Sequence, residues 1–219
     1  MFILTDLTSL SAGKKMYLLS LLVIGLFAVL MLGETAVGIA TTLTGVMCVV
    51  LAAERKLSNF VWAFINAVLY GYISYTQKFY GDMALNWGVY IPFQMIGYYM
   101  WRTQMADGVA STRTLDKSGR FWYLVGGLAL TLGLSEVLRH IGGHAPLTDA
   151  PNVVLSLLAT WLLANRYAEQ WACWIAVNIS GVWLWFQASG DNSGAGLVMW
   201  VLFLINSLYG YWQWMSHSK

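Results

Sequence analysis

The hydrophobic positions of this chain gather into long runs that short polar segments interrupt. A helix that crosses a bilayer needs about 20 mostly apolar residues, with about 17–25 as the usual range. Eight runs approach this length, and each predicts a membrane-spanning helix. The predicted spans are Met16–Leu32, Thr35–Ala53, Phe60–Thr76, Met83–Trp101, Phe121–Leu138, Ala150–Ala164, Trp171–Ala188 and Ala195–Met215. The pattern therefore predicts an all-α integral membrane protein with eight transmembrane helices.

Two prolines fall within these spans. Pro92 is expected to kink the fourth helix, because a proline has no N–H to donate and crowds the preceding turn. Pro151 is expected in the first turn of the sixth helix, where a backbone N–H would have no acceptor within the helix.

Composition supports a membrane protein. Charged residues make up 10% of the chain, against roughly 25% in soluble domains, and hydrophobic residues make up 58%. A soluble protein needs more polar surface than this, so an ordinary globular enzyme is excluded. The net charge of +2 comes without a basic cluster, which excludes nucleic acid as a partner.

The chain also lacks the residue patterns of common catalytic and metal sites. Cys48 and Cys173 lie in apolar runs and form no CxxC motif. Paired carboxylates, a Ser–His arrangement and metal-ligand spacings are all missing from the sequence. We therefore expect no enzyme activity, no cofactor and no metal.

Lysine and arginine residues fall almost entirely on one side of the predicted spans. With the N-terminus inside, ten of the 12 basic residues face the cytoplasm, while Lys78 and Arg139 face the opposite side. Cytoplasmic loops of membrane proteins carry such an excess. An even number of spans then places both termini in the cytoplasm.

The second to fourth spans resemble the sixth to eighth in sequence. Arg55 aligns with Arg166 at a shift of 111 residues, and Trp62 aligns with Trp174 at a shift of 112. Five further identities share a shift of 113, namely Gly81/Gly194, Trp87/Trp200, Gly97/Gly210, Tyr98/Tyr211 and Trp101/Trp214. Because the charge distribution makes both halves enter the membrane from the same side, the repeats are parallel, as in SWEET-type transporters.

This 3+1+3 arrangement divides the chain into four parts. Residues 1–34 form an extra N-terminal helix, residues 35–104 the first three-helix repeat, residues 105–145 a loop and linker helix, and residues 146–219 the second repeat. Parallel repeats are typical of small transporters, so the architecture favours a transporter over a receptor or an enzyme.

Polar and aromatic side chains recur at helical spacing inside the repeats and predict a binding cavity. Such groups are costly in a bilayer and usually face the interior of a helix bundle. The candidate substrate-binding residues are Trp62, Asn66, Tyr70, Asn86, Gln94, Tyr98, Trp174, Asn178, Trp185 and Asn206. A structural alternative is that Asn66 and Asn178 only hold helices together through hydrogen bonds. Trp101, Trp171, Trp212 and Trp214 are expected at the membrane surface.

The cavity is expected to contain amides and aromatic rings rather than charges. Asp82 lies near it, but at the end of a span, and Glu136 and Arg139 are expected to form an ion pair one helical turn apart. Without a carboxylate or histidine relay at membrane depth, we expect transport to be uncoupled from protons. The cavity suits a flat, cationic aromatic ring with hydroxyl-bearing attachments, whereas a phosphate would need lysine or arginine.

Several short blocks of sequence resemble the PnuC family of bacterial vitamin transporters. The resemblance covers roughly residues 41–215. Its blocks include Lys56-Leu-Ser58-Asn59, Ile65-Asn66, Tyr70-Gly71, Ile96-Gly-Tyr-Tyr-Met-Trp101, Asn165-Arg166-Tyr167 and Trp171-Ala-Cys-Trp174-Ile-Ala-Val-Asn178.

The resemblance implies a transporter of the bacterial inner membrane that moves nicotinamide riboside into the cytoplasm by facilitated diffusion. It also implies a homotrimer surrounded by membrane lipid and a cytoplasmic kinase that traps the substrate by phosphorylation. The substrate contacts that it favours are Trp174, Asn178, Asn66 and Gln94. Transport of thiamin or riboflavin stays open, as does a membrane scaffold or sensor that transports nothing.

Overall fold

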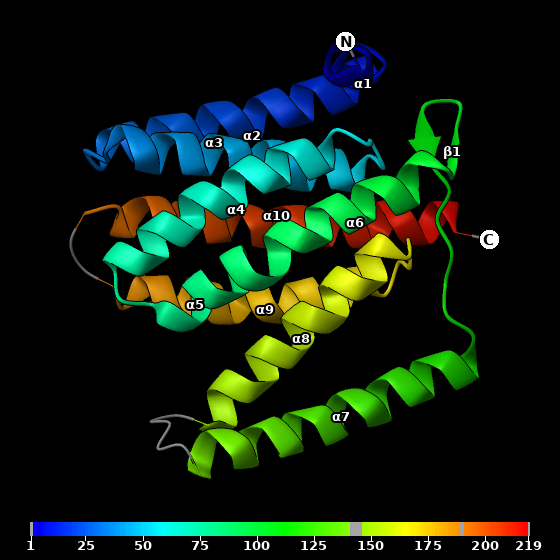
Figure 1. Ribbon diagram of the computed structural model, residues 1–219. Coiled ribbons are helices and arrows are strands. Elements are labelled where there is room, and N and C mark those ends of the chain that lie inside the picture. Colours follow the sequence, from blue (N-terminus) through cyan, green and yellow to red (C-terminus); the bar gives the residue numbers. More distant parts are fainter. Residues whose placement is uncertain (1, 141–145, 189–190, 219) are drawn as a thin grey trace.

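The computed structural model describes residues 2–140, 146–188 and 191–218, and helices dominate it (Figure 1). The helices are α1 (Phe2–Thr8), α2 (Ala12–Met31), α3 (Ala36–Ala53), α4 (Asn59–Thr76), α5 (Tyr80–Ala84), η1 (Leu85–Tyr90), α6 (Ile91–Arg102), α7 (Lys117–His140), α8 (Pro146–Ala164), α9 (Gln170–Phe186) and α10 (Ser193–His217). Strands β1 (Met105–Ala106) and β2 (Val109–Ala110) form a short antiparallel hairpin between α6 and α7. The all-α prediction is confirmed apart from this hairpin, which the hydrophobic pattern did not reveal.

Seven of the eight predicted spans each coincide with one described helix, although these helices differ in length. Among the described residues, α2, α3, α7 and α10 are long and apolar enough to cross a membrane, and α8 contains a shorter apolar stretch. Helix α1 was not predicted, because its 7 residues are too few to show a helical periodicity.

The fourth predicted span, Met83–Trp101, is not one regular helix. It comprises the end of α5, the π-helical turn η1 and most of α6. Pro92 lies in the first turn of α6, directly after η1. Because a π turn is wider than an α turn, it leaves room for a ring that would crowd a regular helix. The break expected at Pro92 therefore takes the form of a change in helix type.

The expectation for Pro151 is wrong, because this residue lies inside α8 rather than in its first turn. The helix begins at Pro146, which takes the first helical position itself. A proline in a helix interior removes one backbone hydrogen bond, and α8 nevertheless continues to Ala164.

Helices α3, α4, α9 and α10 form the centre of the bundle, and α2 covers α3 and α10. Figure 1 shows α5 and α6 running beside α4, while α8 crosses toward α7 at the edge. Helix α6 packs on α8, and α10 packs on α3. The last helix of each predicted repeat therefore contacts the first helix of the other.

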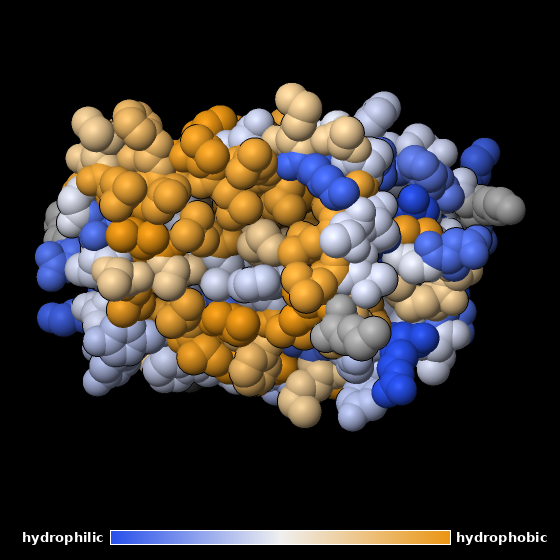
Figure 2. All heavy atoms as spheres, turned by 90° about the horizontal axis from the view of Figure 1, so that it is seen from above, coloured by the Kyte–Doolittle hydropathy of each residue, from blue (hydrophilic) through white to orange (hydrophobic). Residues whose placement is uncertain are grey.

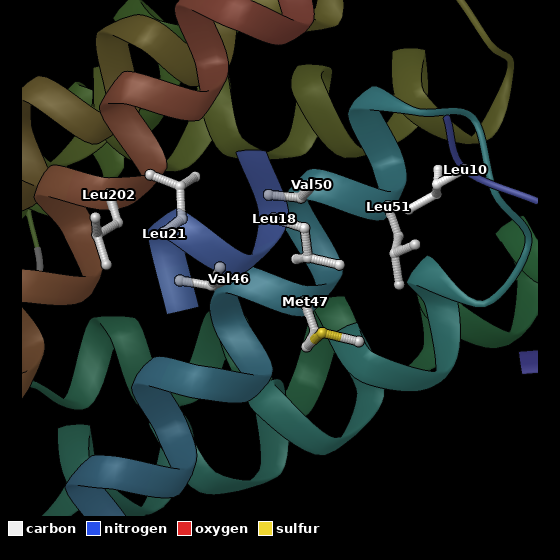
Figure 3. Close-up of a cluster of buried hydrophobic side chains, with 8 residues drawn as sticks. All are labelled: Leu10, Leu18, Leu21, Val46, Met47, Val50, Leu51 and Leu202. Carbon is white, nitrogen blue, oxygen red and sulfur yellow. The ribbon is translucent and has the colours of Figure 1, made fainter. Parts of the chain in front are cut away.

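A cluster of buried aliphatic side chains fixes the N-terminal helix against the bundle (Figure 3). Leu18 and Leu21 of α2 pack with Val46 and Val50 of α3 and with Leu202 of α10. Spacings of three and four residues place these side chains on one face of each helix. Helix α2, which lies outside the predicted repeats, is therefore packed on both of them.

Hydrophobic side chains also cover the outside of the bundle. Figure 2 shows a broad hydrophobic area on the face that carries α2, with hydrophilic residues gathered toward the two ends. Val23, Ile24 and Phe27 of α2 are each more than half exposed. An apolar surface of this extent marks contact with lipid or with another protein, and its place between two polar ends suits a lipid-facing belt.

Helices α3 and α8 end in the same way. Each is followed by an arginine in the left-handed conformation, Arg55 with φ 58° and Arg166 with φ 65°. The residue after each arginine bonds back to the last turn of its helix, at 2.8 and 2.9 Å. The connector after α6 joins both ends, because Ala110 N donates to Arg55 O at 3.0 Å and Arg113 N donates to Arg166 O at 3.1 Å.

Candidate substrate-binding site

A cavity of about 130 Å³ lies inside the bundle, far larger than the roughly 10–15 Å³ that one water needs. Side chains from α3, α4, α8, α9 and α10 line it, together with the stretch from α5 to α6. The lining combines amides, hydroxyls and aromatic rings with one carboxylate, and its described residues include no lysine, arginine or histidine. A ligand here would meet directional hydrogen-bonding groups and ring faces.

The structure brings six of the ten predicted site residues together around this cavity. They are Asn66, Tyr70, Asn86, Gln94, Trp174 and Asn178. Asn66 precedes Tyr70 by four residues on α4, as Trp174 precedes Asn178 on α9, which places each pair on one helix face. Contact of these residues with a substrate stays a prediction.

The other four predicted residues lie outside the lining. Trp62 packs against the aliphatic cluster of α2 and α3, and Tyr98 packs against buried aromatic residues. Trp185 is buried, at 1% exposure, behind the cavity wall. Asn206 Nδ2 donates to Val49 O at 2.8 Å and so links α10 to α3. Helical spacing correctly predicted which helices surround the cavity. It did not predict that the side chains of these four residues pack elsewhere in the bundle.

Asn66 and Asn178 both donate hydrogen bonds to neighbouring helices, and Asn66 Nδ2 also has longer contacts with Thr44 Oγ1 at 3.5 Å and Met199 Sδ at 3.7 Å. Asn66 Nδ2 donates to Thr41 O of α3 at 2.8 Å, and Asn178 Nδ2 donates to Ser207 Oγ of α10 at 2.6 Å. The structural alternative for these residues is therefore observed. It does not exclude ligand contact, because the side-chain carbonyl oxygen of each amide can still accept a hydrogen bond, and both residues line the cavity.

Tyr70 lies at the centre of a polar cluster, at the end of the cavity near the turn between α4 and α5. Trp185 Nε1 and Trp200 Nε1 donate to the Tyr70 hydroxyl at 2.7 and 2.8 Å. The hydroxyl donates in turn to Asp82 Oδ2 at 2.9 Å. We call Tyr70, Asp82, Trp185 and Trp200 the Tyr70 cluster.

The expectation of a lining without charges is wrong, because Asp82 lines the cavity. The sequence places this residue at the end of a predicted span, where a carboxylate normally faces water. In the structure α5 packs on α4 and brings the carboxylate of Asp82 against Tyr70. The ion pair expected on the linker helix is confirmed, since Arg139 Nη1 lies 2.9 Å from Glu136 Oε2.

Some lining residues were not predicted as site residues. Gln170 begins α9, is fully buried, and accepts a hydrogen bond from Trp174 Nε1 at 3.0 Å. Its own Nε2 has no hydrogen-bond partner in the described part of the chain, so it offers a donor to a ligand oxygen. Tyr90 and Trp200 also line the cavity, and the four-residue step from Asn86 was a usable signal for Tyr90.

Three tryptophans lie at the opposite end of the bundle, and they are buried rather than at the membrane surface. Trp101, Trp171 and Trp214, here called the tryptophan cluster, are 0%, 3% and 0% exposed. The rings of Trp101 and Trp214 lie 5.8 Å apart, and Trp171 meets Trp214 edge to face at 6.0 Å. Trp101 Nε1 donates to Leu163 O at 3.0 Å, and Trp214 Nε1 donates to Ala52 O at 3.1 Å.

Comparisons with known proteins place this geometry in a family. Residues 35–216 match the family described as nicotinamide mononucleotide transporter. A protein of Neisseria mucosa named nicotinamide riboside transporter PnuC is 42% identical over 186 residues, which cover 80% of this chain and 70% of the relative. A relative of the same name from Haemophilus influenzae is 34% identical over 181 residues, covering 81% of this chain and 78% of its own.

A solved structure shares the fold. The crystal structure of the vitamin B3 transporter PnuC superposes with a TM-score of 0.86 at 33% identity, and the match covers 96% of this chain and 95% of that one. The apolar helices around a central cavity and these likenesses define the class as a multi-pass membrane transporter, not an enzyme. The chain belongs to the nicotinamide mononucleotide transporter family, and its resemblance to the PnuC proteins is confirmed.

Proposed function

We propose that the chain is a uniporter that moves nicotinamide riboside into the cytoplasm by facilitated diffusion. The observation that carries the proposal is the cavity lining, which combines amides and aromatic rings and has no basic side chain among its described residues. Aromatic faces bind a pyridinium ring by stacking and cation–π attraction. Amides supply hydrogen bonds for the ribose hydroxyls and the carboxamide.

The same lining favours a riboside over a mononucleotide. The family description names a mononucleotide, whereas the relatives are named for the riboside. A phosphate is usually held by arginine, lysine or a helix N-terminus, and the described lining residues include no lysine or arginine. The unphosphorylated compound is therefore the better match, and its phosphorylation by a cytoplasmic kinase would trap it after transport.

The proposed contacts begin with the six predicted residues around the cavity. Trp174 and Tyr70 would flank the aromatic ring, while Asn66, Asn86, Gln94 and Asn178 would bond to its polar groups. Of the four remaining predicted residues, Trp185 would act through Tyr70, to which it donates a hydrogen bond. Trp62, Tyr98 and Asn206 would support helices that line the site.

We further propose eight membrane crossings with both termini in the cytoplasm of a bacterial inner membrane. The excess of basic residues on the side of the α3–α4 and α8–α9 connections supports this orientation. Because α4, α5–α6 and α9 carry the polar residues of the cavity, their composition falls short of a simple apolar span. The four-part division at residues 34, 104 and 145 belongs to the same proposal, although 141–145 lie outside the described residues.

The parallel 3+1+3 repeats are supported by matching contacts in the two halves. A Cβ built on Gly97 would lie 2.4 Å from the ring of Phe60, and one built on Gly210 would lie 2.5 Å from the ring of Trp171. The bonds of Trp101 to Leu163 and of Trp214 to Ala52 connect the halves in both directions. The broad apolar face of α7, with Leu124, Leu128 and Leu132 more than half exposed, suits lipid or a homotrimer interface.

Calorimetric titration of the purified protein with nicotinamide riboside, thiamin and riboflavin tests the substrate. We expect nicotinamide riboside to bind at least about tenfold more tightly than either alternative, a difference of about 1.4 kcal/mol. Preference for thiamin or riboflavin would reassign the cargo. Binding of none of the three would favour a scaffold or sensor. In loaded vesicles, a protonophore should leave equilibration of the riboside unchanged, and a loss of accumulation would contradict uniport.

Asn178→Ala tests the central contact. The variant leaves a substrate polar group without its partner, so we expect affinity for nicotinamide riboside to fall about tenfold or more. Calorimetry measures the affinity, and thermal unfolding separates it from loss of the bond to Ser207. Asn165→Ala is the matched control, because Asn165 Nδ2 donates to Trp161 O and Asn165 is not among the described residues that line the cavity. Unchanged affinity in folded Asn178→Ala protein would remove Asn178 from the site.

A further inference from the structure

The hydrogen bonds of the Tyr70 cluster fix the direction of one proton. A tyrosine hydroxyl has one hydrogen to donate and lone pairs that accept. Indole N–H groups only donate, so Trp185 and Trp200 occupy the acceptor side of the Tyr70 hydroxyl, at 2.7 and 2.8 Å. The hydroxyl hydrogen is therefore directed to Asp82 Oδ2, 2.9 Å away. This bond stabilises Asp82 as a carboxylate, because a hydrogen bond to an ionised acceptor is roughly twice as strong as a neutral one.

The charge of Asp82 has no counter-ion in the described part of the protein. No ion pair of Asp82 occurs among the described residues, and its side chain lines the cavity. The described lining residues include no lysine, arginine or histidine. Lys78, the basic residue nearest to it in sequence, is exposed. A carboxylate away from bulk water is stable only when a charge or hydrogen bonds compensate it, and Tyr70 supplies one such bond.

We propose that Asp82 selects the cargo by charge, with its carboxylate serving as the counter-ion of the pyridinium ring of a riboside. This inference rests on the proposed function and adds a specificity-determining residue to it. Besides its proposed place against the aromatic ring, Tyr70 holds the carboxylate at the cavity wall through its hydroxyl, and Trp185 and Trp200 donate hydrogen bonds to Tyr70 in turn.

Charge selection of this kind rejects close relatives of the cargo. A riboside whose ring carries a carboxylate in place of the carboxamide brings a negative group toward Asp82. A mononucleotide brings a phosphate, and like charges in a cavity of low dielectric repel strongly. An uncharged dihydropyridine riboside keeps the shape and the carboxamide but gives up the attraction. Thiamin is also cationic, so Asp82 defines a charge class and the amides choose within it.

Asp82→Asn tests the charge with little change in shape. The amide oxygen can still accept the Tyr70 hydrogen bond, so the cluster should persist while the charge is lost. We expect affinity for nicotinamide riboside, measured by calorimetry, to fall about 10- to 100-fold. Affinity for the uncharged dihydropyridine riboside should change less than about twofold, because no ion pair is lost with that ligand.

Two further variants keep the test decisive. Asp82→Glu retains the charge and should bind nicotinamide riboside more tightly than Asp82→Asn. Asp107→Asn is the matched control, because Asp107 is exposed in the β1–β2 turn with φ 49°, a conformation that asparagine accepts. Asp82→Asn protein that binds nicotinamide riboside like wild type would overturn the inference, as would equal losses in Asp82→Asn and Asp82→Glu. If wild type itself fails to bind the riboside, the proposed function fails instead.

Discussion

The two ends of the cavity differ in the kind of bonds that close them. At one end the Tyr70 cluster joins α4, α5, α9 and α10 through hydrogen bonds between side chains. At the other end the tryptophan cluster packs ring against ring, and two of its N–H groups bond to backbone carbonyls. A bond to a backbone carbonyl survives many changes of neighbouring side chain, whereas a bond between two side chains depends on both. The Tyr70 end is therefore the more sensitive to substitution.

The two ends also differ in symmetry between the halves. Trp101 and Trp214 align at a shift of 113 residues, and each donates its indole N–H to backbone carbonyls of the opposite half, Trp101 to Leu163 O and Trp214 to Ala52 O and Ala53 O. Asp82, at the same shift, aligns with Ala195, which has no polar side chain. The repeat positions are thus identical where the two tryptophans hold the halves together, and they differ where Asp82 adds a carboxylate to the cavity lining. This difference assigns a structural role to the tryptophan cluster and a ligand-related role to the Tyr70 cluster.

Adding one methyl group at each end of the cavity should have the largest effect, and the two additions should differ in whether they lower riboside affinity. A Cβ on Gly196 would lie 2.0 Å from the ring of Trp185, and a Cβ on Gly97 would lie 2.4 Å from the ring of Phe60. Overpacking of this kind costs about 1–3 kcal/mol of stability at either site. Gly196→Ala should also displace Trp185 from Tyr70 and lower riboside affinity at least about tenfold.

The outcome separates the two ends because each variant is measured by both thermal unfolding and calorimetry. Gly97→Ala should lose stability with little change in affinity, since Phe60 does not line the cavity. If Gly97→Ala lowered riboside affinity as much as Gly196→Ala, the Tyr70 end would have no special role in binding.

Replacing the indoles of the tryptophan cluster should lower stability without lowering riboside affinity, and by a similar amount for Trp101 and Trp214. Trp101→Phe removes the N–H donor of Leu163 O, and Trp214→Phe removes the N–H donor that Ala52 O and Ala53 O share. Each variant also leaves a small void, so each should cost about 1–3 kcal/mol. Thermal unfolding of the two variants should give similar shifts. Because the rings lie 5.8 Å apart, the two substitutions should not be independent. The stability lost in the double variant should therefore differ from the sum of the losses in the two single variants. A loss confined to one variant would contradict the equivalence of the two bonds.

The helical architecture could be predicted from the sequence because apolar runs of membrane length have few other solutions. What escaped prediction depends on local geometry. The π turn η1 between α5 and α6 leaves the apolar pattern of Met83–Trp101 unchanged, so periodicity could not reveal it. The β1–β2 hairpin has two residues in each strand, too few for an alternating pattern.

The sequence predicted which helices surround the site, but it predicted only part of the side chains that line it. Asn66 and Asn178 line the cavity, as expected, because a polar amide inside a membrane span is costly in lipid and usually faces the interior of the bundle. Asp82 and Gln170 were missed because both stand at the start of a helix, where a polar residue normally faces water. Their burial results from tertiary packing, such as that of α5 on α4 beside Asp82, which a single sequence does not express. Trp171 was misplaced for the same reason.

A methyl group added far from both ends of the cavity should have the smallest effect on stability, and it should stabilise the protein rather than destabilise it. Gly133 lies in the interior of α7, and a Cβ built on it would meet no heavy atom within 4 Å. Alanine costs about 0.5–1 kcal/mol less than glycine in a helix interior, so Gly133→Ala should raise the unfolding temperature slightly and leave riboside affinity unchanged. The same glycine-to-alanine change would then weaken binding at the Tyr70 end, weaken only stability at the tryptophan end, and do neither on α7. Destabilisation by Gly133→Ala would mean that α7 is packed closely against another molecule in the membrane, which would support the proposed homotrimer interface at this helix.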